Sequence, residues 1–162
     1  MPDIIVRPAR REDFPAWQPL WQGYNAFYGR AGDTALPEEI TALTWQRFFD
    51  PLEPLAALVA ERGGSLVGIA HYFVHRSTIE AVGRCYLADL FTDPAHRGRG
   101  IARRLIEAVY ADARESGVGS VWWQTHETNA TARKLYDRLA DRSGFVVYRR
   151  TLDQIPKSEA DA

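Results

Sequence analysis

The residues from Arg97 to Ala102 read RGRGIA and combine two glycines with two arginines. Glycine lets a backbone approach a ligand closely, and the arginines bring positive charge to the same place. An apolar run from Cys85 to Thr92 precedes this loop, and an amphipathic stretch begins at Ile101. The first N–H groups of a helix are free, and the helix dipole favours anions there. Strand, loop and helix start together predict a phosphate cradle.

Other interpretations of this loop can be compared with the motifs they require. The chain has no GxxxxGK followed by Ser or Thr, so the loop is not a nucleotide P-loop. The third glycine of a dinucleotide-binding GxGxxG is also missing, and the loop lies late in the chain. A solvated Arg-Gly turn before a surface helix remains an alternative for the loop taken alone.

A second motif strengthens the first. Asn129 and Tyr136 lie seven residues apart, or two helical turns, and so share one face of a predicted helix. The segment 97–102 resembles the Q/R-x-x-G-x-G/A acetyl-CoA loop of the GCN5-related N-acetyltransferases, the GNAT superfamily. The segment 129–136 looks like that family's second motif. The resemblance implies an N-acetyltransferase that uses acetyl-CoA as co-substrate.

Composition sets limits on the class of protein. The chain has 162 residues, 46% hydrophobic and 25% charged, which suits one globular domain over 1–154 with a frayed tail over 155–162. A net charge of −1 gives no electrostatic case for nucleic acid or an anionic membrane. A single cysteine, Cys85, excludes an internal disulfide and favours the cytoplasm. We expect no transmembrane span and no signal peptide.

The apolar periodicity predicts an alternation of strands and helices. Strands are expected at 4–7, 55–61, 66–75, 84–92, 118–126 and 144–152, and helices at 11–28, 37–49, 101–115 and from 128 or 129 to about 141. This order is the one that the GNAT resemblance implies, an α/β fold with a mixed, mostly antiparallel sheet flanked by helices.

The same resemblance implies where the cofactor lies. In that fold two central strands splay apart and the pantetheine arm pairs with one of them like an added strand. Backbone groups at the end of the strand 84–92 would then hold the arm and polarise the thioester carbonyl. The candidate cofactor-binding residues are Leu90, Phe91, Thr92, Arg97, Gly98, Arg99, Gly100, Ile101, Ala102 and Asn129.

Acetyl transfer to an amine needs two proton movements. An alkyl ammonium has a pKa near ~10.4, so reaching the reactive neutral form at pH 7 costs about 4.6 kcal/mol. The departing thiolate then needs a proton, which a tyrosine can donate. Tyr136 occupies the family's general-acid position, and the alternative is a packing role on its helix face.

The base is harder to assign. Asp89 lies inside a strand pattern, where an unpaired carboxylate is costly, so it either pairs structurally or faces the substrate. The strand around it resembles that of diamine acetyltransferases, which usually carry two adjacent acids where this chain has Ala88 first. His71, His75 and His126 could substitute as bases, although a structural role is the simpler interpretation for each. No spacing predicts a metal site.

The acceptor class rests on aromatic residues and on the C-terminal motif. Tyr24 and Tyr28 end an aromatic helix, and the loop that follows borders the acceptor pocket in the family, so they could bind an amine together with Asp89. Gly144-Phe145 follows Tyr136 at eight and nine residues, which resembles the histone-and-polyamine group, whose members often pair through C-terminal strands. We therefore expect a homodimer that acetylates a small primary amine, polyamine or amino-acid-like, by direct transfer in a ternary complex. A protein lysine or N-terminal acetyltransferase and a non-catalytic acyl-CoA-binding protein are the alternatives.

Overall fold

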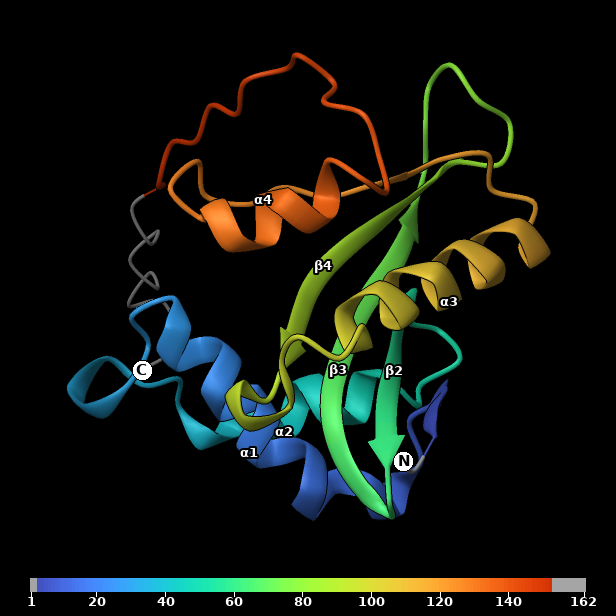
Figure 1. Ribbon diagram of the computed structural model, residues 1–162. Coiled ribbons are helices and arrows are strands. Elements are labelled where there is room, and N and C mark those ends of the chain that lie inside the picture. The colour runs from blue at the N-terminus through green and yellow to red at the C-terminus, as the bar shows by residue number, and fades with distance from the viewer. Residues whose placement is uncertain (1–2, 153–162) are drawn as a thin grey trace.

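The structure is a computed structural model that describes residues 3–152 (Figure 1). Five strands form one sheet: β1 (Ile4–Pro8), β2 (Leu55–Arg62), β3 (Ser65–His75), β4 (Arg84–Thr92) and β5 (Val121–Trp122). Four α-helices accompany the sheet: α1 (Phe14–Phe27), α2 (Glu38–Arg47), α3 (Ile101–Glu115) and α4 (Ala130–Tyr136). Among the described residues no helix is long and apolar enough to cross a membrane.

The strands lie side by side in chain order, β1-β2-β3-β4-β5. The first three pairings are antiparallel, and β4 pairs with β5 in parallel. This confirms the expected mixed, mostly antiparallel sheet. A tight turn at Gly63 and Gly64 joins β2 to β3, whereas helices α1 and α2 lie between β1 and β2, and the parallel pair needs the crossover helix α3.

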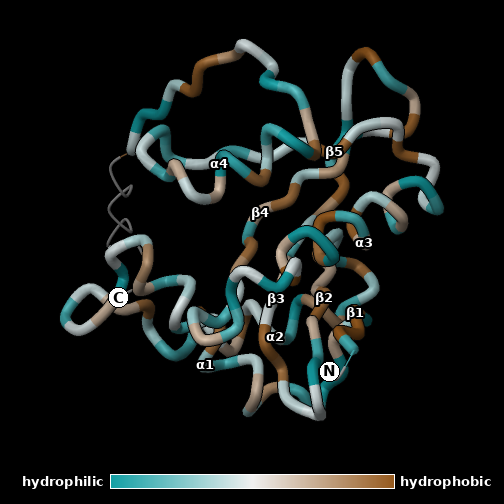
Figure 2. The backbone as a smooth tube through the Cα atoms, in the orientation of Figure 1, coloured by the Kyte–Doolittle hydropathy of each residue, from teal (hydrophilic) through white to brown (hydrophobic). Residues whose placement is uncertain are grey.

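Helices cover both faces of the sheet, so the core has two parts (Figures 1 and 2). On one face α3 buries an apolar stripe that includes Leu105, Ile106 and Val109 against the strands. On the other face α1 and α2 contribute Trp17 and Trp45, which pack on strand residues of β2 and β3. Cys85 is fully buried on the α3 face, where its side chain packs in the core.

The side chains of β4 exchange faces of the sheet halfway along the strand. His71 is paired with Asp89 while the next residue of β3, Tyr72, is paired with Leu87, so Ala88 is an extra residue in β4. A bulge of this kind reverses the alternation of side chains beyond it. Leu87 therefore packs on the α3 face, and Asp89 points to the α1 face, where it meets His71.

The predicted strands near the C-terminal end are wrong in length or absent. The strand expected at 118–126 is reduced to Val121–Trp122, and the segment 144–152 forms no strand within the described residues. Phe145 and Tyr148 are 89% and 92% exposed. A strand needs a neighbour for its backbone groups, and the described chain provides none here. The helix expected to reach about 141 ends at Tyr136, and the tail expected at 155–162 lies outside the described residues.

Candidate active site

The Arg-Gly loop lies at the start of α3, with the backbone geometry that an anion cradle requires. Gly98 and Gly100 have φ angles of 74° and 78°, a region that favours glycine, and Gly100 is the residue directly before the helix. Nothing lies within 4 Å of the position that a Cβ would take at either glycine. Because the first N–H groups of α3 have no partner inside the helix, the loop presents them to open space beside the exposed Arg97 and Arg99.

The end of β4 leads directly into this loop and has a free edge. β4 pairs with β5 only at Cys85 and Tyr86, so within the described residues its backbone beyond Tyr86 has no strand partner on that side. This confirms the expected splay of the central strands. The hydroxyl of Thr92 is buried without a hydrogen-bond partner in the described part of the chain. An orphaned hydroxyl beside a free strand edge and an anion cradle fits an extended ligand that ends in phosphates.

Three of the predicted cofactor residues use their side chains for packing. Leu90 and Ile101 pack in the α3-face core, and Ile101 is only 1% exposed. The ring of Phe91 packs on α1 beside a hollow of about 380 Å³ that Arg97 also borders. These residues can therefore contact a cofactor mainly through backbone groups or, for Phe91, through a ring face.

Asn129 and Tyr136 occupy opposite ends of α4. The amide oxygen of Asn129 accepts the N–H of Ala132 at 3.4 Å, so Asn129 caps the start of the helix. Burial, with the nearby Tyr28 adding to it, raises the pKa of Tyr136 to about 12. Tyr136 therefore keeps its proton at neutral pH. Its ring packs edge-on against Trp123, which holds the phenol in place.

Asp89 and His71 are joined on the α1 face of the sheet. The distance from His71 Nδ1 to Asp89 Oδ2 is 3.0 Å, and the Asp89 side chain keeps 20% of its surface exposed. On the other side of the ring, Trp17 donates its indole N–H to His71 Nε2 at 2.9 Å. Because both ring nitrogens have partners, His71 is not a free base. Asp89 thus has the structural pairing that the sequence left open, and its carboxylate also remains partly accessible.

The predicted aromatic residues lie beside Asp89. Burial, followed by the charge of Asp89 and hydrogen bonding to it, raises the pKa of the Tyr24 phenol. Tyr24 and Tyr28 have ring centroids 5.1 Å apart. The guanidinium of Arg30 lies over both rings, at 5.9 and 5.6 Å, so the protein itself already supplies a cation there. Sequence reasoning missed Arg30, although its place directly after the aromatic helix was a usable signal.

The two other candidate histidines are engaged or exposed. His75 Nε2 accepts the indole N–H of Trp122 at 2.9 Å, and its Nδ1 lies 2.9 Å from the carbonyl of Arg76. His126 is exposed and contacts Thr128. Neither is placed by these contacts beside Asp89.

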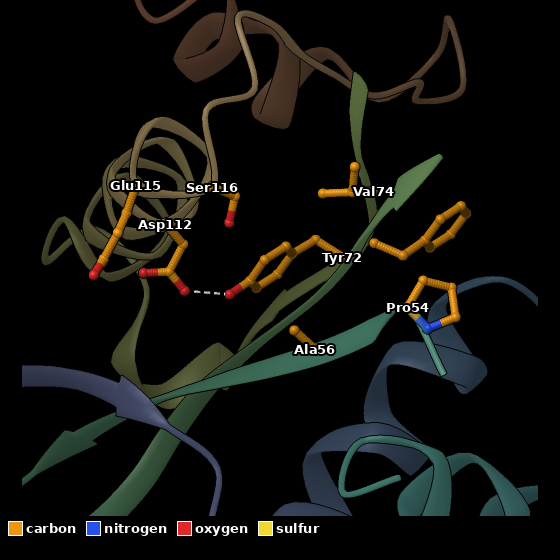
Figure 3. A pocket seen from close by; sticks show the side chains of 8 residues that line it. Pro54, Ala56, Tyr72, Val74, Asp112, Glu115 and Ser116 are labelled. Atoms are coloured by element: carbon orange, nitrogen blue, oxygen red, sulfur yellow. Dashed lines mark hydrogen bonds between the residues drawn. The ribbon is translucent and has the colours of Figure 1, made fainter. Parts of the chain in front are cut away.

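A second hollow, of about 350 Å³, lies away from the predicted site (Figure 3). It opens on the α3 face of the sheet, where Tyr72 hydrogen bonds to Asp112. The predicted residues do not line it. The residues brought together by the structure are instead those at the end of α1, along β4, in the Arg-Gly loop and on α4.

The chain resembles known N-acetyltransferases in sequence and in fold. Residues 17–140 match the sequence model of the acetyltransferase (GNAT) family. The D-amino-acid N-acetyltransferase HPA3 of Saccharomyces cerevisiae is 34% identical over 149 residues, which cover 91% of this chain and 90% of that protein. The uncharacterized N-acetyltransferase YhfO of Bacillus subtilis is 28% identical over 88% of this chain and 94% of its own. The aminoglycoside N-acetyltransferase AAC(6')-Iy, solved in complex with CoA, has the same fold, with a TM-score of 0.79, 18% identity, and coverage of 93% of this chain and 96% of that one.

Proposed function

This chain belongs to the acetyltransferase (GNAT) family, and we propose that its acceptor is a small amino-acid-like molecule that carries a primary amine and a carboxylate. The protein is an acetyl-CoA-dependent N-acetyltransferase. Acetyl-CoA supplies the activated acetyl group, and the residues of this chain must bind the acceptor, remove a proton from its ammonium group and stabilise the departing sulfur.

One observation carries the proposed acceptor class: two opposite charges act on the same phenol. The carboxylate of Asp89 raises the pKa of Tyr24, whereas the guanidinium of Arg30 lowers it, although burial remains the largest effect. A negative and a positive group near the same ring complement a zwitterion. The acceptor ammonium would lie near Asp89 and its carboxylate near Arg30.

Arg30 is held in a way that leaves its outer nitrogens available. Its Nε donates to the Asn25 amide oxygen at 2.7 Å, and Asn25 Nδ2 donates to the Trp21 carbonyl at 2.8 Å. Because a carbonyl only accepts, this second bond fixes the amide with its oxygen toward Arg30. In the described part of the chain Arg30 has no ion pair.

The fixed charge of Arg30 also bears on the polyamine alternative. A diamine or polyamine would bring a second ammonium group toward the guanidinium, which is unfavourable. An amino acid would bring a carboxylate instead. The similarity to the yeast D-amino-acid N-acetyltransferase supports the same acceptor class.

The proposed reaction assigns separate tasks to Asp89, β4 and Tyr136. Asp89 binds the ammonium, and it accepts the proton that the nitrogen loses once it has attacked the thioester, directly or through a water. Backbone N–H groups on the free edge of β4 hold the carbonyl oxygen. Transfer of a proton from Tyr136, with a pKa of about 12, to a thiolate near ~8.5 would be uphill by roughly 5 kcal/mol. Tyr136 therefore serves as a hydrogen-bond donor to the developing thiolate.

Steady-state assays of free-thiol release test the acceptor class. We expect higher kcat/KM for single amino acids than for diamines, polyamines or lysine-containing peptides. Arg30→Gln should lower kcat/KM for amino acids by about 10- to 100-fold, as expected for a lost hydrogen-bonded charge pair, and should leave acetyl-CoA binding unchanged. Efficient acetylation of diamines or peptides, with no detectable acetylation of amino acids, would contradict the proposal.

We also infer a homodimer, because the segment 144–152 presents apolar side chains that the described chain leaves uncovered. Phe145, Val146, Val147 and Tyr148 are between 69% and 92% exposed. Figure 1 shows this segment running beside α4, away from the sheet. Light scattering after size exclusion should give twice the mass of one chain, and Val147→Asp should shift it toward the monomer. A wild-type protein that stays monomeric at high concentration would contradict the dimer.

A further inference from the structure

His71 is a buried titratable residue to which the proposed reaction gives no direct role. It is 2% exposed, and its ring packs against Trp17, Trp21 and Phe48. A polar ring in such an aromatic enclosure needs hydrogen-bond partners. Its two partners are Trp17 and Asp89, one at each nitrogen.

The partner at Nε2 decides which nitrogen of His71 carries the proton. An indole N–H only donates, so His71 Nε2 must accept through its lone pair. A neutral imidazole that accepts at Nε2 carries its proton at Nδ1. That proton points to Asp89 Oδ2, 3.0 Å away, where a carboxylate accepts it.

We propose that His71, fixed by Trp17 as the Nδ1–H tautomer, is a positioning residue that orients the carboxylate of Asp89 toward the acceptor amine. This inference rests on the proposed role of Asp89. By occupying one carboxylate oxygen, the histidine sets the direction in which Asp89 presents its remaining lone pairs.

The position of Asp89 in β4 explains why such support is needed. It follows the extra residue Ala88 and lies in the part of β4 that has no strand partner on the β5 side in the described chain. The ladder therefore holds this stretch from one side only. His71 lies in β3, the strand that does pair with it, and so ties the side chain to the rigid part of the sheet.

The tautomer can be measured without any activity assay. Long-range proton–nitrogen NMR on histidine-labelled protein, with the His71 signals assigned through His71→Asn, should show a proton on Nδ1 and none on Nε2. Trp17→Phe should allow the Nε2–H form to appear. Trp21→Phe is the matched control, because Trp21 also packs on His71 but its buried N–H has no hydrogen-bond partner among the described residues. An Nε2–H or cationic His71 in the wild type would overturn the inference.

Kinetics then separate positioning from packing. His71→Leu removes the donor, whereas His71→Asn keeps an N–H donor close to the place of Nδ1. We expect kcat to fall roughly 10- to 100-fold in His71→Leu, as for a misplaced catalytic group, with an unchanged KM for acetyl-CoA. His71→Asn should recover most of that loss at an equal folded fraction. Equal kcat in His71→Leu and His71→Asn would overturn the inference. A wild-type kcat in Asp89→Asn would instead contradict the proposed function, without affecting the tautomer that NMR measures for His71.

Discussion

Gly23 on α1 lies directly against the ring of Phe91 at the end of β4. A Cβ at position 23 would lie 2.7 Å from Cζ of that ring, closer than two carbon atoms can approach. The absence of a side chain at Gly23 therefore lets α1 and β4 pack together. The guanidinium of Arg97 lies over the same ring, 5.9 Å from its centroid, so a displacement of Phe91 would also disturb the Arg-Gly loop.

Gly23→Ala should weaken acetyl-CoA binding more than it weakens the fold. Alanine in a helix gains up to about 1 kcal/mol over glycine, and overpacking costs about 1–3 kcal/mol, so the helix gain offsets part of the packing cost. The displaced ring should nevertheless raise the Kd for acetyl-CoA several-fold, as measured by calorimetry. Gly119→Ala is the control, because nothing lies within 4 Å of a Cβ there. Unchanged affinity in Gly23→Ala would show that Phe91 does not influence the cofactor site.

Gly100→Val should remove most of the thermal stabilisation that acetyl-CoA provides. A ligand at 100 times its Kd adds about 2.7 kcal/mol to the free energy of unfolding, which raises the Tm by several degrees. A side chain at Gly100 would stand in the open space before α3, and it would also strain a φ of 78°. Gly64→Val is matched for strain, since Gly64 has a φ of 80° and open surroundings in the β2–β3 turn. A full ligand-induced shift in Gly100→Val would contradict the cradle.

Tyr136→Phe should lower kcat about 10²- to 10³-fold, the usual loss when one donor to a developing charge is removed, with little change in acetyl-CoA binding. The pKa of about 12 also fixes the sign of a pH effect. Tyr136 stays protonated below that pH, so it should cause no alkaline loss of kcat between pH 7 and 10. Because its folded pKa exceeds the ordinary ~10, the associated stability is present below pH 10 and is lost as the pH rises toward 12. A wild-type kcat in Tyr136→Phe would show that Tyr136 has only a packing role.

The parts of the fold predicted from sequence are those with strong local patterns. The stripe of α3, its glycine before the first residue and the run of β4 were all expected within one or two residues. The segment 144–152 has an equally good strand pattern but forms no strand, because pairing depends on a neighbour that periodicity cannot reveal. The strand predicted at 118–126 was too long for the same reason, since only the two residues of β5 are paired.

The sequence named four residues of the candidate site, but it missed Arg30 and did not show how the residues pair. Tyr24, Tyr28, Asp89 and Tyr136 were all singled out by type and position. The direction of Asp89 depends on the extra residue Ala88, and a bulge leaves no periodic trace in so short a run. The bond from Trp17 to His71 joins residues 54 positions apart, which no local pattern indicates.

Asp89→Asn should separate catalysis from structure. An asparagine keeps an oxygen that can accept from His71 Nδ1, so the free energy of unfolding should change little. It removes the charge that the ammonium group needs and the site that takes its proton, so kcat/KM for the amine should fall about 10²- to 10⁴-fold. Asp112→Asn is the control, because Asp112 pairs with Tyr72 on the opposite face of the sheet and should leave acceptor kinetics unchanged. Normal kinetics per folded molecule in Asp89→Asn, combined with a lower Tm, would show that Asp89 is a structural residue. A solvent water would then be the simplest proton acceptor.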